Sequence, residues 1–250
     1  MKIAIITGGS RGLGKSMAQS LAEKGTDVIL TYHSKEGEAQ EVVAQIEAMG
    51  RRAVALQLDV SKSAGFGDFA ARIESALKEK WGVEKFDFLV NNAGTGLSVP
   101  LMETTEEQFD EMVNVHFKSV FFLTQKLLPL MNDGGRIINI SSGLARSSFP
   151  GSSAYGSVKG AVEVLSRYMA KELGPRGIAV NVVAPGAIET DFRGGHTRDN
   201  KQANAAIASV TALGRAGLPD DIGPMVASLL SDDNRWVNGQ RIEVSGGMML

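Results

Sequence analysis

Two side chains near the middle of the chain, Tyr155 and Lys159, have the types and the spacing needed for proton transfer. Residues four apart share a face of a helix, so the phenol and the ammonium can reach the same cleft. A free tyrosine loses its proton at about pH 10, too high for a general base at neutral pH. A lysine cation nearby favours the phenolate and lowers that pKa toward the working range. Such a pair suits the interconversion of alcohols and ketones.

A serine at the end of a strand would complete this set. Residues 137–140 (IINI) predict a buried strand, and the strand delivers Ser141 and Ser142 at its carboxyl end. A hydroxyl there could hydrogen-bond a substrate oxygen while the phenol gives or takes the proton, with no metal required. The alternative is an ordinary surface Tyr–Lys pair, since short motifs have a high false-positive rate.

A glycine-rich turn lies near the amino terminus. Residues 2–6 (KIAII) predict a strand covered on both faces, and it runs directly into Thr7–Gly14 (TGGSRGLG) and a helical pattern. Gly8 permits a tight turn, Gly12 lets the backbone approach a pyrophosphate, and the helix N-terminus favours negative charge. The spacing G-x-x-x-G-x-G differs from the commoner dinucleotide fingerprint, so a plain strand-to-helix turn remains the alternative.

The end of the next expected strand, Asp27–Tyr32, bears on cofactor choice. An acidic residue there would hold the ribose hydroxyls of NAD, and a basic one would accommodate the 2′-phosphate of NADP. Residues 31–35 (TYHSK) contain no carboxylate, and Arg11 of the glycine turn could reach the same region. We therefore expect NADP to be preferred, with NAD possible. His33 is a weaker phosphate partner than arginine because histidine is mostly uncharged at neutral pH, and it can equally be a solvated loop residue.

Two further strand ends carry candidate cofactor contacts. Ala53–Leu58 delivers Asp59 and Val60, where a carboxylate could accept from an adenine amine or cap the next helix. Phe86–Val90 ends in NNAG, residues 91–94, whose small side chains let a flat ring approach the backbone. Simple turn chemistry is the alternative for that segment.

Three later features complete the pattern. Asn114 lies within an apolar stretch of the helix that follows a capping-box sequence at Thr105, so its amide needs partners. It could bond a backbone carbonyl or hold a water that relays protons to Lys159. The strand Ile178–Ala184 runs into a segment in which the Thr190 hydroxyl could bind a carboxamide. From about residue 187 to 213 the pattern weakens, which predicts a substrate-binding loop or lid whose basic residues either meet an anionic substrate or are solvated.

Composition narrows the class of protein. The 250 residues alternate between strand and helix patterns, so a single α/β domain over residues 1–250 is expected. The net charge of −2 argues against nucleic-acid or anionic-membrane binding. The chain has no cysteine, and its three histidines lack metal-ligand spacing, so no metal site is expected. No signal peptide or membrane-length apolar run is evident, so we expect a cytoplasmic protein.

Taken in order, these motifs resemble the short-chain dehydrogenase/reductase family over essentially the whole chain. The matching pieces are TGGSRGLG, Asp59, NNAG, Asn114, Ser142, Y-x-x-x-K, PG and the terminal GQRIEVSGG. Within the family the chain is most similar to 3-oxoacyl-carrier-protein reductases and broad ketoreductases. The resemblance implies a doubly wound Rossmann-type fold with a seven-stranded parallel sheet, a nicotinamide cofactor and a homotetramer.

The same resemblance assigns residues to the site. Ser142 lies thirteen residues before Tyr155, the family spacing, and is therefore favoured over Ser141 as the catalytic serine. The implied catalytic residues are Asn114, Ser142, Tyr155 and Lys159. The implied cofactor-binding residues are Gly8, Ser10, Arg11, Gly12, Leu13, Gly14, His33, Asp59, Val60, Asn91, Ala93, Gly94, Tyr155, Lys159, Pro185, Gly186, Ile188 and Thr190. The chain departs from the family at His33, where NADP-preferring relatives often have arginine.

The expected function is that of an NADP-dependent carbonyl reductase or alcohol dehydrogenase. Its substrate would be a small ketone or 3-oxoacyl compound, with acyl-carrier-linked substrates included, and Tyr155 would act as the acid or base. One alternative is a sugar or secondary-alcohol dehydrogenase that uses NAD. Another is a non-catalytic nucleotide-sensing protein on the same fold, although such a protein would be expected to have lost catalytic residues.

Overall fold

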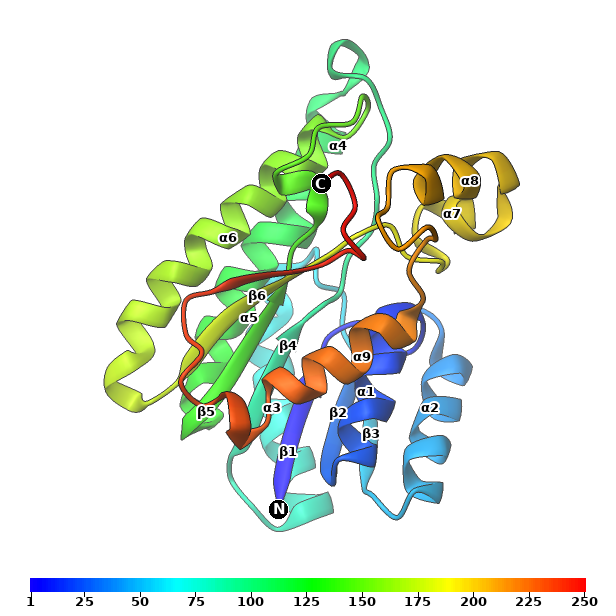
Figure 1. Ribbon diagram of the computed structural model, residues 1–250. Helices are drawn as coiled ribbons and strands as arrows, with labels where there is room; N and C mark the ends of the chain where they lie inside the picture. Colours follow the sequence, from blue (N-terminus) through cyan, green and yellow to red (C-terminus); the bar gives the residue numbers. More distant parts are fainter.

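The computed structural model describes all residues 1–250 and contains one seven-stranded sheet (Figure 1). All neighbouring strands pair in parallel, in the order β3-β2-β1-β4-β5-β6-β7. The strands are β1 (Lys2–Ile6), β2 (Thr26–Tyr32), β3 (Ala53–Gln57), β4 (Phe86–Asn91), β5 (Met131–Ile140), β6 (Ala179–Pro185) and β7 (Arg241–Val244). The predicted doubly wound Rossmann-type architecture is confirmed.

Helices lie on both faces of this sheet (Figure 1). They are α1 (Gly12–Glu23), α2 (Glu36–Ala48), α3 (Phe66–Ala76), α4 (Glu106–Val113), α5 (Ser119–Leu127), α6 (Ser153–Leu173), α7 (His196–Asp199), α8 (Lys201–Ser209) and α9 (Pro219–Leu229). Two π-helical turns, η2 (Leu77–Trp81) and η4 (Asn114–Lys118), extend α3 and join α4 to α5. Among these helices, none combines the length and the apolar character needed to cross a membrane.

The alternation of side chains along β1 separates the core into two layers. Ala4 and Ile6 pack into a cluster that includes apolar residues of α1, α2 and α9, whereas Ile3 and Ile5 pack into one that includes residues of α3, α5 and α6. Successive side chains of a strand point to opposite faces, so a continuous apolar run is what a doubly covered strand requires. The sheet is thereby fixed as a rigid layer between the two sets of helices.

The order of the strands determines where a ligand can bind. β1 pairs with β2 on one side and with β4 on the other, so the chain reverses its direction of winding there. In open α/β sheets ligands bind at this point, beyond the carboxyl ends of the strands. The glycine turn, NNAG and the two serines follow β1, β4 and β5 at that edge.

Two stretches of the chain show where its helices end and begin. α5 ends at Leu127, because Pro129 cannot continue it and Met131 already begins β5. The segment 187–213, expected as a substrate-binding loop or lid, contains α7 and α8. The Asn200 side chain caps α8 by accepting hydrogen bonds from the backbone of Gln202 and Ala203, both at 3.0 Å. The capping box at Thr105 is present as predicted.

Candidate active site

Tyr155 and Lys159 lie on the first two turns of α6, and both are buried. The Lys159 Nζ lies 5.7 Å from the centre of the Tyr155 ring and donates a 2.7 Å hydrogen bond to the carbonyl of Ile140, the last residue of β5. Ser142 follows that strand, and its Oγ accepts from the Leu144 amide at 3.1 Å. The end of β5 and the start of α6 therefore hold the three side chains against one another.

The pKa values of this pair differ from the sequence-based expectation. Burial raises the pKa of Tyr155 to about 12, although the Arg193 cation and a hydrogen bond with Ser142 lower it. Burial also lowers the pKa of Lys159 to about 7. The expected lowering of the tyrosine pKa by Lys159 is wrong in this state, because desolvation opposes charge on both groups. Tyr155 is consequently a protonated phenol at neutral pH.

These side chains face a cavity of about 1460 Å³ at the carboxyl edge of the sheet. Of the residues expected to form the site, Ser142, Tyr155 and Lys159 line it. So do Gly8, Ser10, Arg11, Gly12, Leu13, Gly14, His33, Asp59, Val60, Ala93, Gly94, Pro185, Gly186, Ile188 and Thr190. The fold thus brings segments from separate strand ends to one space.

Asn91 does not line this cavity. It is the last residue of β4, and its buried amide donates to Thr124 at 3.0 Å and to Asn139 at 2.8 Å. The next residue, Asn92, lines the cavity and donates to the carbonyls of Thr7 and Gly8 at 2.9 and 3.1 Å. Of this pair only Asn92 faces the cavity, since neighbouring side chains at a strand end point in opposite directions, and the cofactor role of Asn91 stays a prediction.

Asn114 also lies outside the cavity lining. It is half-buried and is the first residue of the π-helical turn η4, where the Ser119 N–H donates to its carbonyl. Single π-helical turns occur frequently at functional sites because they displace backbone groups from the regular ladder. The proton-relay role of Asn114 remains a prediction that rests on this local break in the helix.

The glycine turn forms a cradle that fits a phosphate group. Gly8 has φ +65°, and a Cβ there would lie 2.9 Å from the Ala93 Cα. A Cβ at Gly14 would collide with the Gly8 carbonyl oxygen. No side chain caps the N-terminus of α1, and its first turn holds no acidic residue. The free N–H groups and the helix dipole therefore form a site that can bind an anion, and the pyrophosphate of a dinucleotide fits it.

The cavity wall beyond β2 includes the residues considered above for cofactor choice. Arg11 is exposed and lies 3.6 Å from Asp191, while His33 is exposed and lies 3.7 Å from Asp59. The wall also includes Tyr32, Ser34 and Lys35. Sequence reasoning noted the lack of a carboxylate here, but it did not identify Ser34 and Lys35 as lining residues.

Comparison with known proteins agrees with this geometry. A family model described as enoyl-(acyl carrier protein) reductase matches residues 8–249. An uncharacterised oxidoreductase of Methylorubrum extorquens is 39% identical, with 99% of this chain and 97% of that protein covered. The chain belongs to the short-chain dehydrogenase/reductase family. It therefore belongs to a family of NAD(P)-dependent oxidoreductases that act on alcohol and carbonyl groups.

Other members of the short-chain dehydrogenase/reductase family with assigned reactions are similar over the full length. Tetrahydroxynaphthalene reductase PfmaG of Pestalotiopsis fici is 37% identical, covering 98% of this chain and 91% of that one. The structure of LugOII, a promiscuous reductase that catalyses keto-reduction in lugdunomycin biosynthesis, has a TM-score of 0.94 and 40% identity, covering 100% and 98%. The angucycline C-6 ketoreductase LanV, solved with bound NADP, has a TM-score of 0.94 and 37% identity, covering 99% and 95%.

Several site residues of this family member were not found from sequence. Behind Ser142, the Arg241 Nε donates to Glu163 at 2.6 Å and its Nη2 donates to the Ser142 carbonyl at 3.4 Å. The Ser141 hydroxyl donates to the same Glu163 oxygen atom at 2.8 Å. Arg241 and Glu163 lie far from Ser142 along the chain, so only the folded chain reveals that they hold its backbone.

Two other rings pack around Tyr155. The His116 ring stands edge-on to it at 5.1 Å, and the Phe192 ring lies at 5.8 Å. Burial lowers the pKa of His116 to about 2, with a smaller effect of Lys159, so the imidazole is neutral. Its Nδ1 is buried with no hydrogen-bond partner. Sequence reasoning considered His116 only as a metal ligand and left its place beside the phenol unrecognised.

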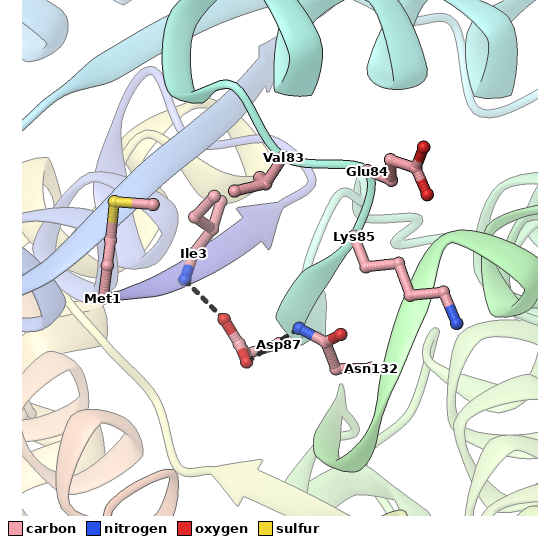
Figure 2. Close-up of a pocket in the computed structure, with 7 residues that line it drawn as sticks. All are labelled: Met1, Ile3, Val83, Glu84, Lys85, Asp87 and Asn132. Atoms are coloured by element: carbon pink, nitrogen blue, oxygen red, sulfur yellow. Dashed lines mark hydrogen bonds between the residues drawn. The ribbon is translucent and has the colours of Figure 1, made fainter.

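A second hollow, of about 330 Å³, lies at the opposite, amino end of β1 and β4 (Figure 2). There Asp87 accepts hydrogen bonds from the Ile3 amide at 2.9 Å and from Asn132 at 3.1 Å, and it pairs with Lys2 at 3.0 Å. The carboxylate is fully engaged in joining the strand ends. This hollow is therefore structural and lies away from the catalytic edge of the sheet.

Proposed function

We propose that this protein is an NADPH-preferring ketoreductase that converts the carbonyl group of a ketone to a secondary alcohol. One observation carries the proposal: Ser142, Tyr155 and Lys159 open into the same cavity as the uncapped N-terminus of α1. A phosphate anchor and a proton donor on one cavity are the two parts that nicotinamide-dependent carbonyl reduction requires.

The chain's own residues would act on the carbonyl oxygen. NADPH, when bound, supplies the hydride that reaches the carbonyl carbon. Tyr155 donates its phenolic proton to the oxygen as negative charge develops there, and the Ser142 hydroxyl hydrogen-bonds the same oxygen. Lys159, whose Nζ donates to the Ile140 carbonyl, would stabilise the resulting phenolate. Asn114 would support the return of a proton to Tyr155 through water.

The protonation state of Tyr155 suits the role of an acid in ketone reduction. With a pKa of about 12, the phenol holds its proton at neutral pH. A sugar or secondary-alcohol dehydrogenase, which would use the phenolate as a base, is the alternative function.

The apolar part of the cavity supports a bulky aromatic ketone as substrate. Leu144, Phe149, Phe192 and Met248 line it, and the Phe192 ring packs beside Tyr155. Offset and edge-on ring contacts stabilise aromatic ligands in such pockets. The relatives with assigned reactions reduce hydroxynaphthalenes or angucyclines by name, and LanV has also been solved with rabelomycin. A 3-oxoacyl thioester is the alternative substrate that the same chemistry permits.

NADPH preference rests on the wall beyond β2. Arg11, His33 and Lys35 line the cavity there, and no carboxylate occupies residues 31–35 to repel a 2′-phosphate. LanV and a Burkholderia cenocepacia short-chain dehydrogenase bind NADP in their crystals. NAD remains a usable second cofactor in this proposal.

The test is a turnover assay with purified protein. Loss of reduced-cofactor absorbance is followed with NADPH and with NADH, against 2-tetralone and against a 3-oxoacyl thioester. We expect turnover of 2-tetralone with NADPH to be fastest and to be absent in Tyr155→Phe. If the wild type, like the variant, reduced none of the ketones with either NADPH or NADH, the proposal would be contradicted.

We also propose that the protein assembles as a homotetramer. Phe121 and Phe122 of α5 and Val164 and Tyr168 of α6 are exposed, although large apolar side chains on the helices of a monomer are usually covered. The terminal Met249 and Leu250 are exposed as well. Light scattering at micromolar concentration should give a mass of about four chains, and a fully active monomer would refute this assembly.

A further inference from the structure

Arg193 occupies the substrate side of the cavity, directly over the proton donor. Its guanidinium carbon lies 5.6 Å from the centre of the Tyr155 ring and 5.9 Å from that of Phe192. Its Nη2 donates to the Leu97 carbonyl at 2.8 Å and to the Ser152 hydroxyl at 3.2 Å. The side chain thus bridges the segments that follow β4 and precede α6, and it closes over the place where a ketone must sit.

This cation has no anionic partner. The other two arginines of the same cavity wall, Arg11 and Arg198, both pair with Asp191, at 3.6 and 2.6 Å. Arg193 forms no ion pair, its buried Nε makes no hydrogen bond, and its Nη1 makes none either. A half-buried cation without an anion is unfavourable, because desolvation is then not offset by a charge of opposite sign.

The backbone around Arg193 is also unfavourable, and it directs the side chain inward. Arg193 has φ 52° and ψ 41°, and Gly194 and Gly195 follow at φ 67° and 78°. Among these left-handed residues only Arg193 carries a side chain. Gly96 faces it, and a Cβ at Gly96 would collide with the Arg193 side chain. Backbone strain of this kind persists where the surroundings impose it and is concentrated at functional sites.

We infer that Arg193 is a specificity-determining residue that pairs with an acidic oxygen of the substrate, a carboxylate or an ionisable hydroxyl, on the molecule whose ketone is reduced. The inference rests on the proposed ketoreductase function of the same cavity. The accessible Nη1 offers charge-assisted hydrogen bonds to that oxygen. The aromatic rings of Tyr155 and Phe192, which lie next to each other and beside the guanidinium, provide stacking surfaces for the attached ring system.

The test measures binding, so that it does not depend on turnover. Calorimetry with the NADP⁺-loaded protein compares 2-naphthoate with its neutral isostere 2-naphthamide, and 2-naphthol with 2-methoxynaphthalene. The variants are Arg193→Met, which keeps the length of the side chain, and Arg193→Lys, which keeps the charge. Lys201→Met is the control, because it removes an exposed cation of α8 outside the cavity.

We expect wild-type protein to bind one of the two acidic ligands more tightly than its isostere, on the order of tenfold or more. The pairs are 2-naphthoate against 2-naphthamide and 2-naphthol against 2-methoxynaphthalene. Arg193→Met should abolish that ratio, Arg193→Lys should retain part of it, and Lys201→Met should leave it unchanged. A preference for 2-naphthoate reports a carboxylate site, and a preference for 2-naphthol reports a site for an ionisable hydroxyl.

Absence of any preference in the wild type, or equal weakening of acidic ligands and their isosteres in Arg193→Met, would overturn the inference. Weaker NADP⁺ binding in Arg193→Met would also overturn it, since Arg193 would then contact the cofactor. Inactivity of the wild type on ketones would instead count against the proposed function alone.

Discussion

The Nζ of Lys159 lies 5.7 Å from the centre of the Tyr155 ring and is anchored to the Ile140 carbonyl at 2.7 Å. The lysine is therefore fixed by the last residue of β5, while the tyrosine lines the cavity together with Ser142. Burial lowers the pKa of Lys159 to about 7 and raises that of Tyr155 to about 12, so the lysine rather than the tyrosine titrates near neutral pH.

Replacing Tyr155 by phenylalanine should remove turnover and preserve the fold. The ring contacts with His116 and Phe192 remain, and only the proton donor is lost. General acid catalysis contributes about 10²- to 10⁴-fold, so kcat should fall by that order. NADPH affinity, measured by fluorescence titration, should change little. Turnover close to that of the wild type would sink the assignment of Tyr155 as the acid.

Lys159 should give the protein a pH-dependent stability. An unfolded lysine titrates at about 10.4, whereas the buried group titrates at about 7, so between these values the unfolded chain binds one more proton. The free energy of unfolding should consequently rise with pH in this window, by at most about 1.4 kcal/mol per pH unit. The same free energy decreases again as the pH falls toward 7, because the unfolded chain then binds its extra proton more readily. The raised pKa of Tyr155 acts with the opposite sign only above about pH 10.

Urea unfolding at pH 7, 8 and 9 measures this effect. In Lys159→Met the free energy of unfolding should no longer rise with pH. In Lys201→Met, on the exposed face of α8, it should rise as in the wild type. Identical slopes in the wild type and in Lys159→Met would show that Lys159 does not titrate in this range.

Arg11 should carry most of the discrimination between the two cofactors. Its guanidinium is permanently charged and forked, which suits a 2′-phosphate, whereas its 3.6 Å contact with Asp191 is exposed and weak. Charge-assisted phosphate contacts are worth about 1.5–3 kcal/mol, so Arg11→Ala should raise the KM for NADPH on the order of tenfold or more and leave that for NADH nearly unchanged.

Two variants sharpen this comparison of cofactors. Arg198→Ala is the matched control, since it also removes a partner of Asp191 but leaves the glycine turn intact. Tyr32→Asp should shift preference toward NADH by adding a carboxylate at the end of β2. Equal changes for NADPH and NADH in Arg11→Ala would mean that Arg11 does not meet the 2′-phosphate.

Arg241 should support catalysis through the backbone of Ser142. It pairs with Glu163 at 2.6 Å and with Glu243 at 2.8 Å, and its side chain is 8% exposed. Arg241→Met leaves two carboxylates together near the protein interior, which should lower the free energy of unfolding by about 3 kcal/mol. A fall in kcat with little change in the KM for NADPH should accompany it, because the serine loses its support.

The double variant Arg241→Met with Glu163→Gln distinguishes repulsion between the two carboxylates from the loss of the arginine contacts that hold Ser142. Removing one carboxylate should recover at least half of the lost stability, as measured by urea unfolding. The amide oxygen that replaces the carboxylate can still accept from the Ser141 hydroxyl, so part of the kcat should return as well. No recovery of either quantity would show that the carboxylates do not repel each other.

The strands and the catalytic pair could be predicted from sequence because local patterns determine them. An apolar run such as Ile3–Ile6 is typical of a doubly covered strand, and the four-residue spacing of Tyr155 and Lys159 places both on one helix face. The short helix α8 was missed because its alanine-rich pattern is weakly amphipathic, and the Asn200 cap that starts it is a common loop residue too.

The remaining features depend on tertiary contacts. Whether Asn91 or Asn92 faces the cavity depends on where β4 ends, and a shift of one residue exchanges the two faces. The raised pKa of Tyr155 follows from burial by elements far along the chain, so the spacing to Lys159 alone gave the wrong direction. Arg193 reaches Tyr155 only because its backbone adopts a left-handed conformation, for which arginine gives no sequence signal.

The uncapped first turn of α1 has a thermodynamic consequence. No side chain caps its backbone donors and its first turn holds no acidic residue, so a bound pyrophosphate would complete the hydrogen bonding of the helix. A ligand present at about one hundred times its dissociation constant stabilises the folded state by about 2.7 kcal/mol. Cellular nicotinamide dinucleotide would then act as a folding partner of this helix, and the lifetime of the protein would follow the supply of its own cofactor.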